Sequence, residues 1–137
     1  MKELNNKELL ELIKTDVFEF NAYREEYPNQ KIDFSNDNLE GANLEGADLS
    51  WADLYDVNLI GANLIGSNLQ GANLEYANLK VANLTYADLE DANLEYANLG
   101  GADLYDANLE GVNLENAKIT LTKANIEAIK GCRLWIN

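Results

Sequence analysis

The side chains that could do chemistry in this chain are mostly carboxylates, and they lack the usual partners for catalysis. The 137 residues include 24 Asp and Glu but no His, and Cys132 is the single cysteine. This composition removes His-based acid–base chemistry, His metal sites and zinc clusters, and one cysteine excludes an intramolecular disulfide. We interpret Cys132 as inert filler. We therefore expect a protein that is not an enzyme and that holds no cofactor and no metal.

A column of Asn and Asp offers a second candidate for chemistry, because it recurs every five residues. From Ile32 to Asn116, each of seventeen consecutive pentapeptides has Asn or Asp directly before its central residue. The centre is Phe34 once and Leu sixteen times, and in the column Asn outnumbers Asp twelve to five. Calcium sites need clustered carboxylates. We therefore interpret the column as a ladder that hydrogen-bonds between turns of the chain, rather than as a cation site.

The period of five also limits the fold. Neither an α-helix nor a flat strand keeps every fifth residue on one side. A coil does so if each pentapeptide forms one side of a polygon. The central residue and the residue two before it, which is Ala in twelve repeats, then point into a narrow, densely packed interior. Gly in the last position, as at Gly41 and Gly71, eases the backbone turn between sides.

These repeats resemble those of the pentapeptide-repeat family, in its Leu-centred form with Ala-(Asn/Asp)-Leu units, over residues 32–116. The resemblance implies an all-β solenoid, namely a right-handed quadrilateral β-helix with four pentapeptides in each coil. Seventeen repeats would give about four coils and a rod roughly 20 Å long at the usual spacing of strands.

Net charge and the extent of the five-residue repeat divide the chain into three parts of one domain. Residues 32–116 hold sixteen acids and one base, Lys80, whereas residues 1–31 are near neutral and residues 117–137 are basic. We interpret these parts as an N-terminal helical cap, the β-helix and a C-terminal helical cap. Caps are expected because the open ends of a coil stack invite end-to-end association.

The caps should contain three helices. The first follows Asn6 as its N-cap, and its apolar stripe consists of Leu9, Leu10, Leu12 and Ile13. The second spans Val17 to Glu26 before Pro28, with an apolar set of Phe18, Phe20 and Tyr23. The third follows Thr122 and runs through Lys130 to Gly131. The residues expected to plug the last coil are Leu134, Trp135 and Ile136.

Two surface regions follow from the family geometry, in which every fourth pentapeptide stacks on the same face. Two adjacent faces would hold eleven of the fifteen net negative charges of residues 32–116. The first candidate site is an acidic ladder flanked by aromatic rings, made up of Trp51, Tyr55, Glu75, Tyr76, Glu95, Tyr96 and Glu115. It could receive Lys or Arg side chains by ion pairing and cation–π contact. The alternative is that acids keep the rod soluble and tyrosines shield its edges.

The second candidate is a small apolar contact patch made up of Ile60, Ile65, Val81 and Tyr86. It would serve a partner protein or a homodimer, and the alternative is a set of scattered surface residues without a role.

We expect a non-enzymatic interaction or scaffold module that binds a protein partner through flat β-helix faces, and the acidic faces favour a basic partner. The alternative is an acidic DNA mimic that inhibits a DNA-binding enzyme such as gyrase, as some members of the resembled family do. The single Phe centre, the short chain and the basic C-terminal segment argue against the alternative. The net charge of −14 argues against nucleic acid as a direct ligand. No stretch of about 18 apolar residues indicates a membrane span, so we expect a cytoplasmic protein.

Overall fold

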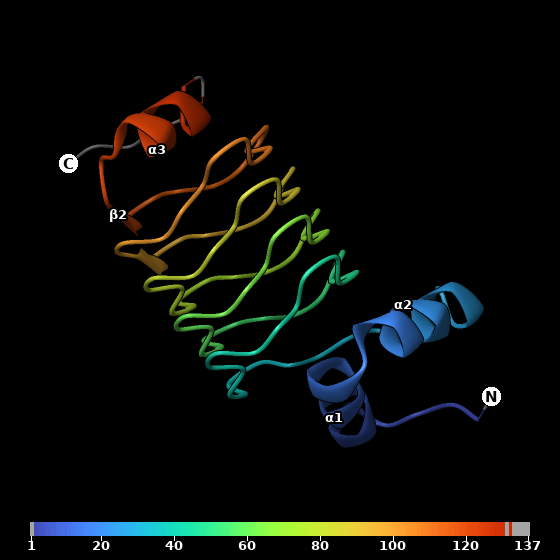
Figure 1. The fold of residues 1–137 in the computed structure, drawn as a ribbon. Coiled ribbons are helices and arrows are strands. Elements are labelled where there is room, and N and C mark those ends of the chain that lie inside the picture. The colour runs from blue at the N-terminus through green and yellow to red at the C-terminus, as the bar shows by residue number, and fades with distance from the viewer. Residues whose placement is uncertain (1, 131, 133–137) are drawn as a thin grey trace.

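The structure is a computed structural model that describes residues 2–130 and 132. Two helices, α1 (Asn6–Thr15) and α2 (Val17–Glu26), precede a stack of coils, and a third, α3 (Lys123–Ala128), follows it. Figure 1 shows the stack as a rod, with α1 and α2 at one end and α3 at the other. The rod therefore has helices at both ends and coils between them.

The coils repeat every twenty residues. Thirteen parallel bridges join residues twenty apart, from Asp33 with Asp53 to Asn93 with Asn113. Two short strands, β1 (Asn98–Leu99) and β2 (Lys118–Ile119), continue the same register, with Asn98 opposite Lys118. Twenty residues are four pentapeptides, so one coil has four sides.

The interior of the rod is filled by the two inward columns that the repeat predicts. Every central Leu and Phe34 is buried, and so are most of the small residues two positions earlier. Ser67 interrupts the Ala column, and its buried hydroxyl has no hydrogen-bond partner. The interior is thus an apolar core that leaves no channel along the rod axis.

The Asn/Asp column forms a ladder, as the sequence indicated. In every repeat the side-chain Oδ1 of this residue accepts the backbone N–H two positions later; the bond from the Ile60 N–H to Asn58 is 3.1 Å long. Several Asn side chains also donate to the residue one coil earlier, and Asn113 Nδ2 lies 3.0 Å from Asn93 Oδ1. An Asp can accept in this ladder but cannot donate, which explains why Asn predominates. The one pair of stacked Asp residues, Asp33 and Asp53, is accompanied by Lys31, 3.6 Å from Asp53.

All seventeen repeats turn at their fifth residue, where the backbone has a positive φ. Gly occupies this corner seven times, from Gly41 to Gly111, and ten corners have other residues. The predicted use of Gly therefore explains fewer than half of the turns. Asn and Asp, which adopt this conformation at little cost, occupy five of the remaining corners.

At the N-terminal end, α2 pairs with the open edge of the first coil through polar side chains. The Asn21 amide accepts the Asp48 N–H at 2.8 Å and donates to the Gly46 carbonyl at 2.9 Å. Arg24, whose side chain is almost fully buried, donates to the Ser50 carbonyl at 2.8 Å and lies 3.6 Å from the Asp48 carboxylate. The Asp48 N–H and the Ser50 carbonyl are groups that would pair with a preceding coil, as the Asn68 N–H and the Gln70 carbonyl do one coil later.

At the C-terminal end, Asn125 of α3 plays the same part. It is fully buried, its Oδ1 accepts the Leu104 N–H at 3.0 Å, and its Nδ2 donates to the Ala102 carbonyl at 3.0 Å. Nδ2 also lies 2.9 Å from the Thr120 carbonyl oxygen. One coil earlier, the equivalent groups pair with backbone: the Leu84 N–H donates to the Asp103 carbonyl, and the Ala82 carbonyl accepts the Asp103 N–H. Leu104 and Ala102 instead bond to a single side chain. Asn125 thus substitutes for a backbone segment of a further coil.

The helices differ from the sequence expectations in three details, and a fourth expectation is not tested. The N-cap of α1 is Asn5 rather than Asn6, because Asn5 forms a capping box with Glu8. Phe18 of α2 is exposed, whereas Phe20 and Tyr23 are buried. Thr122 is the N-cap of α3 as predicted, but α3 ends at Ala128 and not at Lys130. Leu134, Trp135 and Ile136 lie outside the described residues.

Within residues 2–130 and 132, none of the helices has the length and apolar character that a bilayer crossing requires.

Candidate interaction surface

The tyrosines of the first candidate site form one continuous aromatic column along the rod. The rings of Tyr76 and Tyr96 stack with centroids 4.9 Å apart and planes at 5°. Tyr55 meets Tyr76 edge-on at 5.7 Å. The Tyr76 side chain is nevertheless 45% exposed. Desolvation by these neighbours, together with the charges around it, raises the pKa of the Tyr76 hydroxyl. The raised pKa favours the neutral hydroxyl of Tyr76, and the column is an aromatic surface that is open to solvent.

The three glutamates of the site stand on the same face as the tyrosine column. The 20-residue register stacks Glu75, Glu95 and Glu115, and their backbones are linked from coil to coil by the N–H groups of Tyr76 and Tyr96. The ion pairs found among the described residues do not include any of these three carboxylates. Like charges stacked one above another are destabilising. Glu75, Glu95 and Glu115 thus carry negative charge that no cation of the described chain neutralises by direct contact.

Trp51 is the member of the first site that the structure places apart from the others. Its indole lies over Gly71, one coil further along the same corner, where an added Cβ would come within 2.3 Å of the ring. Among the described residues its ring contacts no other aromatic ring, although it is 67% exposed. The predicted acidic-aromatic site is therefore one column of tyrosines and glutamates with Trp51 at a neighbouring corner.

The apolar contact patch is only partly open. Ile60 and Ile65 are half-buried, whereas Val81 and Tyr86 are exposed. Tyr86 packs edge-on against Tyr105, with ring centroids 5.8 Å apart, and Tyr105 is itself exposed. Sequence reasoning missed Tyr105, and the signal that could have found it is its spacing of nineteen residues from Tyr86, which places the two side chains on adjacent coils.

The two candidate surfaces share a backbone feature. At the seventeen corners with positive φ, twelve residues are Gly, Asn or Asp, the types suited to this conformation. The other five are bulky and exposed, and all belong to the predicted sites: Trp51, Tyr76, Val81, Tyr86 and Tyr96. A β-branched or bulky residue with positive φ is an outlier that costs stability. The surface side chains are thus kept at positions where folding alone favours smaller residues.

Val81 gives the clearest test of this cost. We expect Val81→Gly to raise the free energy of unfolding by about 1 kcal/mol, because it relieves a left-handed conformation that is unfavourable for a β-branched residue. Gly61, at the same corner one coil earlier, has a φ of 64°, and a Cβ added there would meet nothing within 4 Å. Gly61→Val should therefore lower stability by a similar amount, through the backbone alone. Denaturant unfolding followed by circular dichroism measures both, and equal stability of the two variants would contradict the argument.

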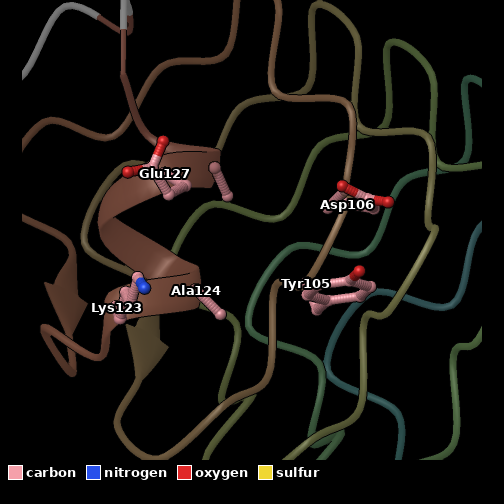
Figure 2. Close-up of a pocket in the computed structure, with 7 residues that line it drawn as sticks. Tyr105, Asp106, Lys123, Ala124 and Glu127 are labelled. Atoms are coloured by element: carbon pink, nitrogen blue, oxygen red, sulfur yellow. The ribbon is translucent and has the colours of Figure 1, made fainter.

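An open recess of about 760 Å³ lies between the last coil and α3, and it adjoins the apolar contact patch through Tyr105, which packs against Tyr86. Figure 2 shows Tyr105 and Asp106 of the coil on one side of it and Lys123, Ala124 and Glu127 of α3 on the other. Its walls thus combine one ring, one ammonium group and two carboxylates.

Cys132 and the carboxylates are the other groups with chemical potential among the described residues. The Cys132 thiol lies 3.3 Å from the Leu109 carbonyl oxygen, and burial raises its pKa, which favours the unreactive protonated thiol. No group of three or more Cys, Asp and Glu side chains is placed to hold a metal ion in this part of the chain.

Comparison with known proteins agrees with the repeat. The family model described as pentapeptide repeats matches eight copies, over residues 32–71, 52–80, 62–95 and 82–120. The chain therefore belongs to the pentapeptide-repeat family, as the sequence indicated. Members of this family fold as right-handed quadrilateral β-helices, which is consistent with the 20-residue register. Such proteins are generally structural or interaction modules.

Two solved structures resemble the chain in both sequence and fold. Rfr23, a pentapeptide repeat protein from the cyanobacterium Cyanothece 51142, is 38% identical with a TM-score of 0.64, over 66% of this chain and 62% of that chain. The chain thus spans less than two thirds of Rfr23. The pentapeptide repeat protein alr5209 from Nostoc PCC 7120 is 34% identical with a TM-score of 0.55, over 79% of this chain and 91% of that one. A comparison with curated proteins found no match.

Proposed function

We propose that the protein is a non-enzymatic interaction module of the cytoplasm, which binds a partner protein through side chains on the outside of its β-helix. The single observation that supports this most strongly is the identity of the five bulky corner residues. Each has a positive φ that disfavours its side chain, and each side chain is exposed. Residues that lower stability at exposed positions are commonly retained for function.

An enzymatic role has less support, because apolar side chains occupy the interior of the described coils. The central Leu and most of the Ala residues are buried there, whereas small-molecule sites are concave. The interaction would therefore take place on the flat faces and corners.

The test is partner capture by a variant in which the five corner residues are all replaced by Asn. Asn tolerates the corner conformation, so the variant should fold, which its circular dichroism spectrum verifies. We expect affinity-tagged wild-type protein to retain a partner from native lysate, and the variant to lose it. A matched control replaces Asn36 and Asn116 by Gly at the ends of one corner column, where partner capture should be unchanged. Retention of every partner by the folded five-site variant would overturn the proposal.

DNA mimicry remains the alternative prediction, on the basis of the concentration of acids on two adjacent faces. Inhibition of gyrase supercoiling by micromolar purified protein would support it, provided that the triple change of Glu75, Glu95 and Glu115 to Gln removes the inhibition. If the wild-type protein has no effect at that concentration, the alternative is excluded.

A further inference from the structure

We infer that the partner presents an extended segment carrying Arg side chains, and that this segment lies along the column of Tyr55, Tyr76 and Tyr96 beside the glutamate ladder. The inference rests on the proposed function and adds to it a location and a partner chemistry.

The aromatic column is partly open to solvent along its length. Tyr76 and Tyr96 lie parallel at 4.9 Å, and Tyr55 extends the column by one coil. The three rings are between 37% and 45% exposed. Aromatic faces and edges that remain in water over this length are suited to planar, weakly hydrated groups. A guanidinium group is such a group, because it stacks on aromatic rings while its N–H groups stay free to donate.

Three glutamates stand beside the tyrosine column. Glu75, Glu95 and Glu115 repeat once per coil, at about 4.8 Å, and none of them belongs to an ion pair of the described chain. Asp53 on the same face does have a cation close by, since Lys31 lies 3.6 Å away. The unneutralised part of this face is thus the part that adjoins Tyr76 and Tyr96. A cationic partner would relieve the repulsion between the stacked carboxylates as it binds.

The surface formed by these rings and carboxylates is linear. Because coils stack in a straight register of twenty residues, rings and carboxylates form parallel lines along the rod rather than a pocket. A line of this kind matches an extended chain. In a polyproline II segment, side chains three residues apart project about 9.3 Å from each other on one side, which is close to two coil steps of about 4.8 Å. Two Arg residues at this spacing span the ladder from Glu75 to Glu115, so that each can reach a carboxylate at one end of it and a neighbouring ring.

The probe for the test is the peptide Arg-Pro-Pro-Arg-Pro-Pro-Arg, titrated into the full-length protein by isothermal calorimetry. We expect binding that the triple change Glu75→Gln, Glu95→Gln and Glu115→Gln weakens about tenfold, since the Arg side chains that lie along the ladder lose their carboxylate partners. The pair Tyr76→Asn and Tyr96→Asn, which suits the corner backbone, should weaken it about fivefold or more. A peptide with Lys in place of Arg should bind less tightly than the Arg peptide, because an ammonium group does not stack in the same way.

The matched control removes the same number of charges from another face. Glu90→Gln, Asp91→Asn and Glu110→Gln together remove three negative charges, as the first triple does, but no tyrosine column adjoins these residues. This control should bind the Arg peptide within about twofold of the wild-type protein. Equal losses for the two triples would show attraction by net charge alone and would overturn the inference, as would the absence of binding. Either result leaves the proposed function standing if the five-site corner variant still loses its captured partner.

Discussion

Leu74→Ala is expected to lower the free energy of unfolding by about 3–4 kcal/mol, which is among the largest effects of any single change in this chain. Leu74 is completely buried at the middle of the rod, between Leu54 and Leu94 of the adjacent coils in the same column. Truncation removes three carbon atoms from a core in which neighbouring Leu residues repeat at fixed spacing. The coils above and below are held by backbone hydrogen bonds, so they cannot collapse to fill the space.

Guanidinium unfolding followed by circular dichroism measures the loss. The matched control is Leu121→Ala, because Leu121 is 70% exposed and its truncation should change the free energy by no more than about 0.5 kcal/mol. Similar stabilities for the two variants would mean that the central residues of the repeats do not point into the rod.

Asn125→Leu is the second large effect, with an expected loss of about 3 kcal/mol. The substitution leaves the Leu104 N–H and the Ala102 carbonyl without the partners that the Asn125 amide now supplies. Each buried backbone group that loses its partner costs about 1–3 kcal/mol. Because these groups form the last edge of the β-helix, opening should begin at this end, and hydrogen exchange at the Leu104 amide should accelerate.

Asn125→Asp tests the accepting and the donating group of this side chain separately. An aspartate still accepts the Leu104 N–H but cannot donate to Ala102, so its stability should lie between those of the wild-type protein and Asn125→Leu. An uncovered edge also pairs with other edges, and size-exclusion chromatography should therefore detect end-to-end association of the Leu variant. Wild-type stability and exchange rates in Asn125→Leu would show that α3 is not what closes this end.

The coils were predictable because the repeat is local and redundant. Each pentapeptide has the same residue types at the same positions, with Ala and Leu inward and Asn or Asp directly before the central residue. The pattern can therefore be recognised despite single exceptions such as Ser67 and Phe34. The hydrogen-bonding role of the Asn column could also be predicted, since the number of Asn residues already argued against a cation site. Register then followed from the family geometry rather than from the residues alone.

The ends and corners were harder to predict, because their features depend on contacts between residues far apart in the sequence. Asn21 and Asn125 are ordinary helix residues until the coil edge is placed against them. Phe18 is one of the apolar residues of α2, but its side chain faces solvent. The corners at Tyr76 and Val81 lack the Gly by which such a turn is recognised, so only their place as the fifth residue of a repeat indicates a positive φ.

The central claim is that the bulky corner residues serve contact with a partner and not folding. The most direct test is photo-cross-linking in living cells with p-benzoylphenylalanine placed at one corner at a time. Tyr96→p-benzoylphenylalanine and Tyr86→p-benzoylphenylalanine replace exposed rings by a similar ring, whereas the same residue at Asn36 probes a corner at the end of the rod. The account predicts a cross-linked species of higher mass from positions 96 or 86 and none from position 36. No cross-link from either tyrosine position, or an equal yield from position 36, would contradict it.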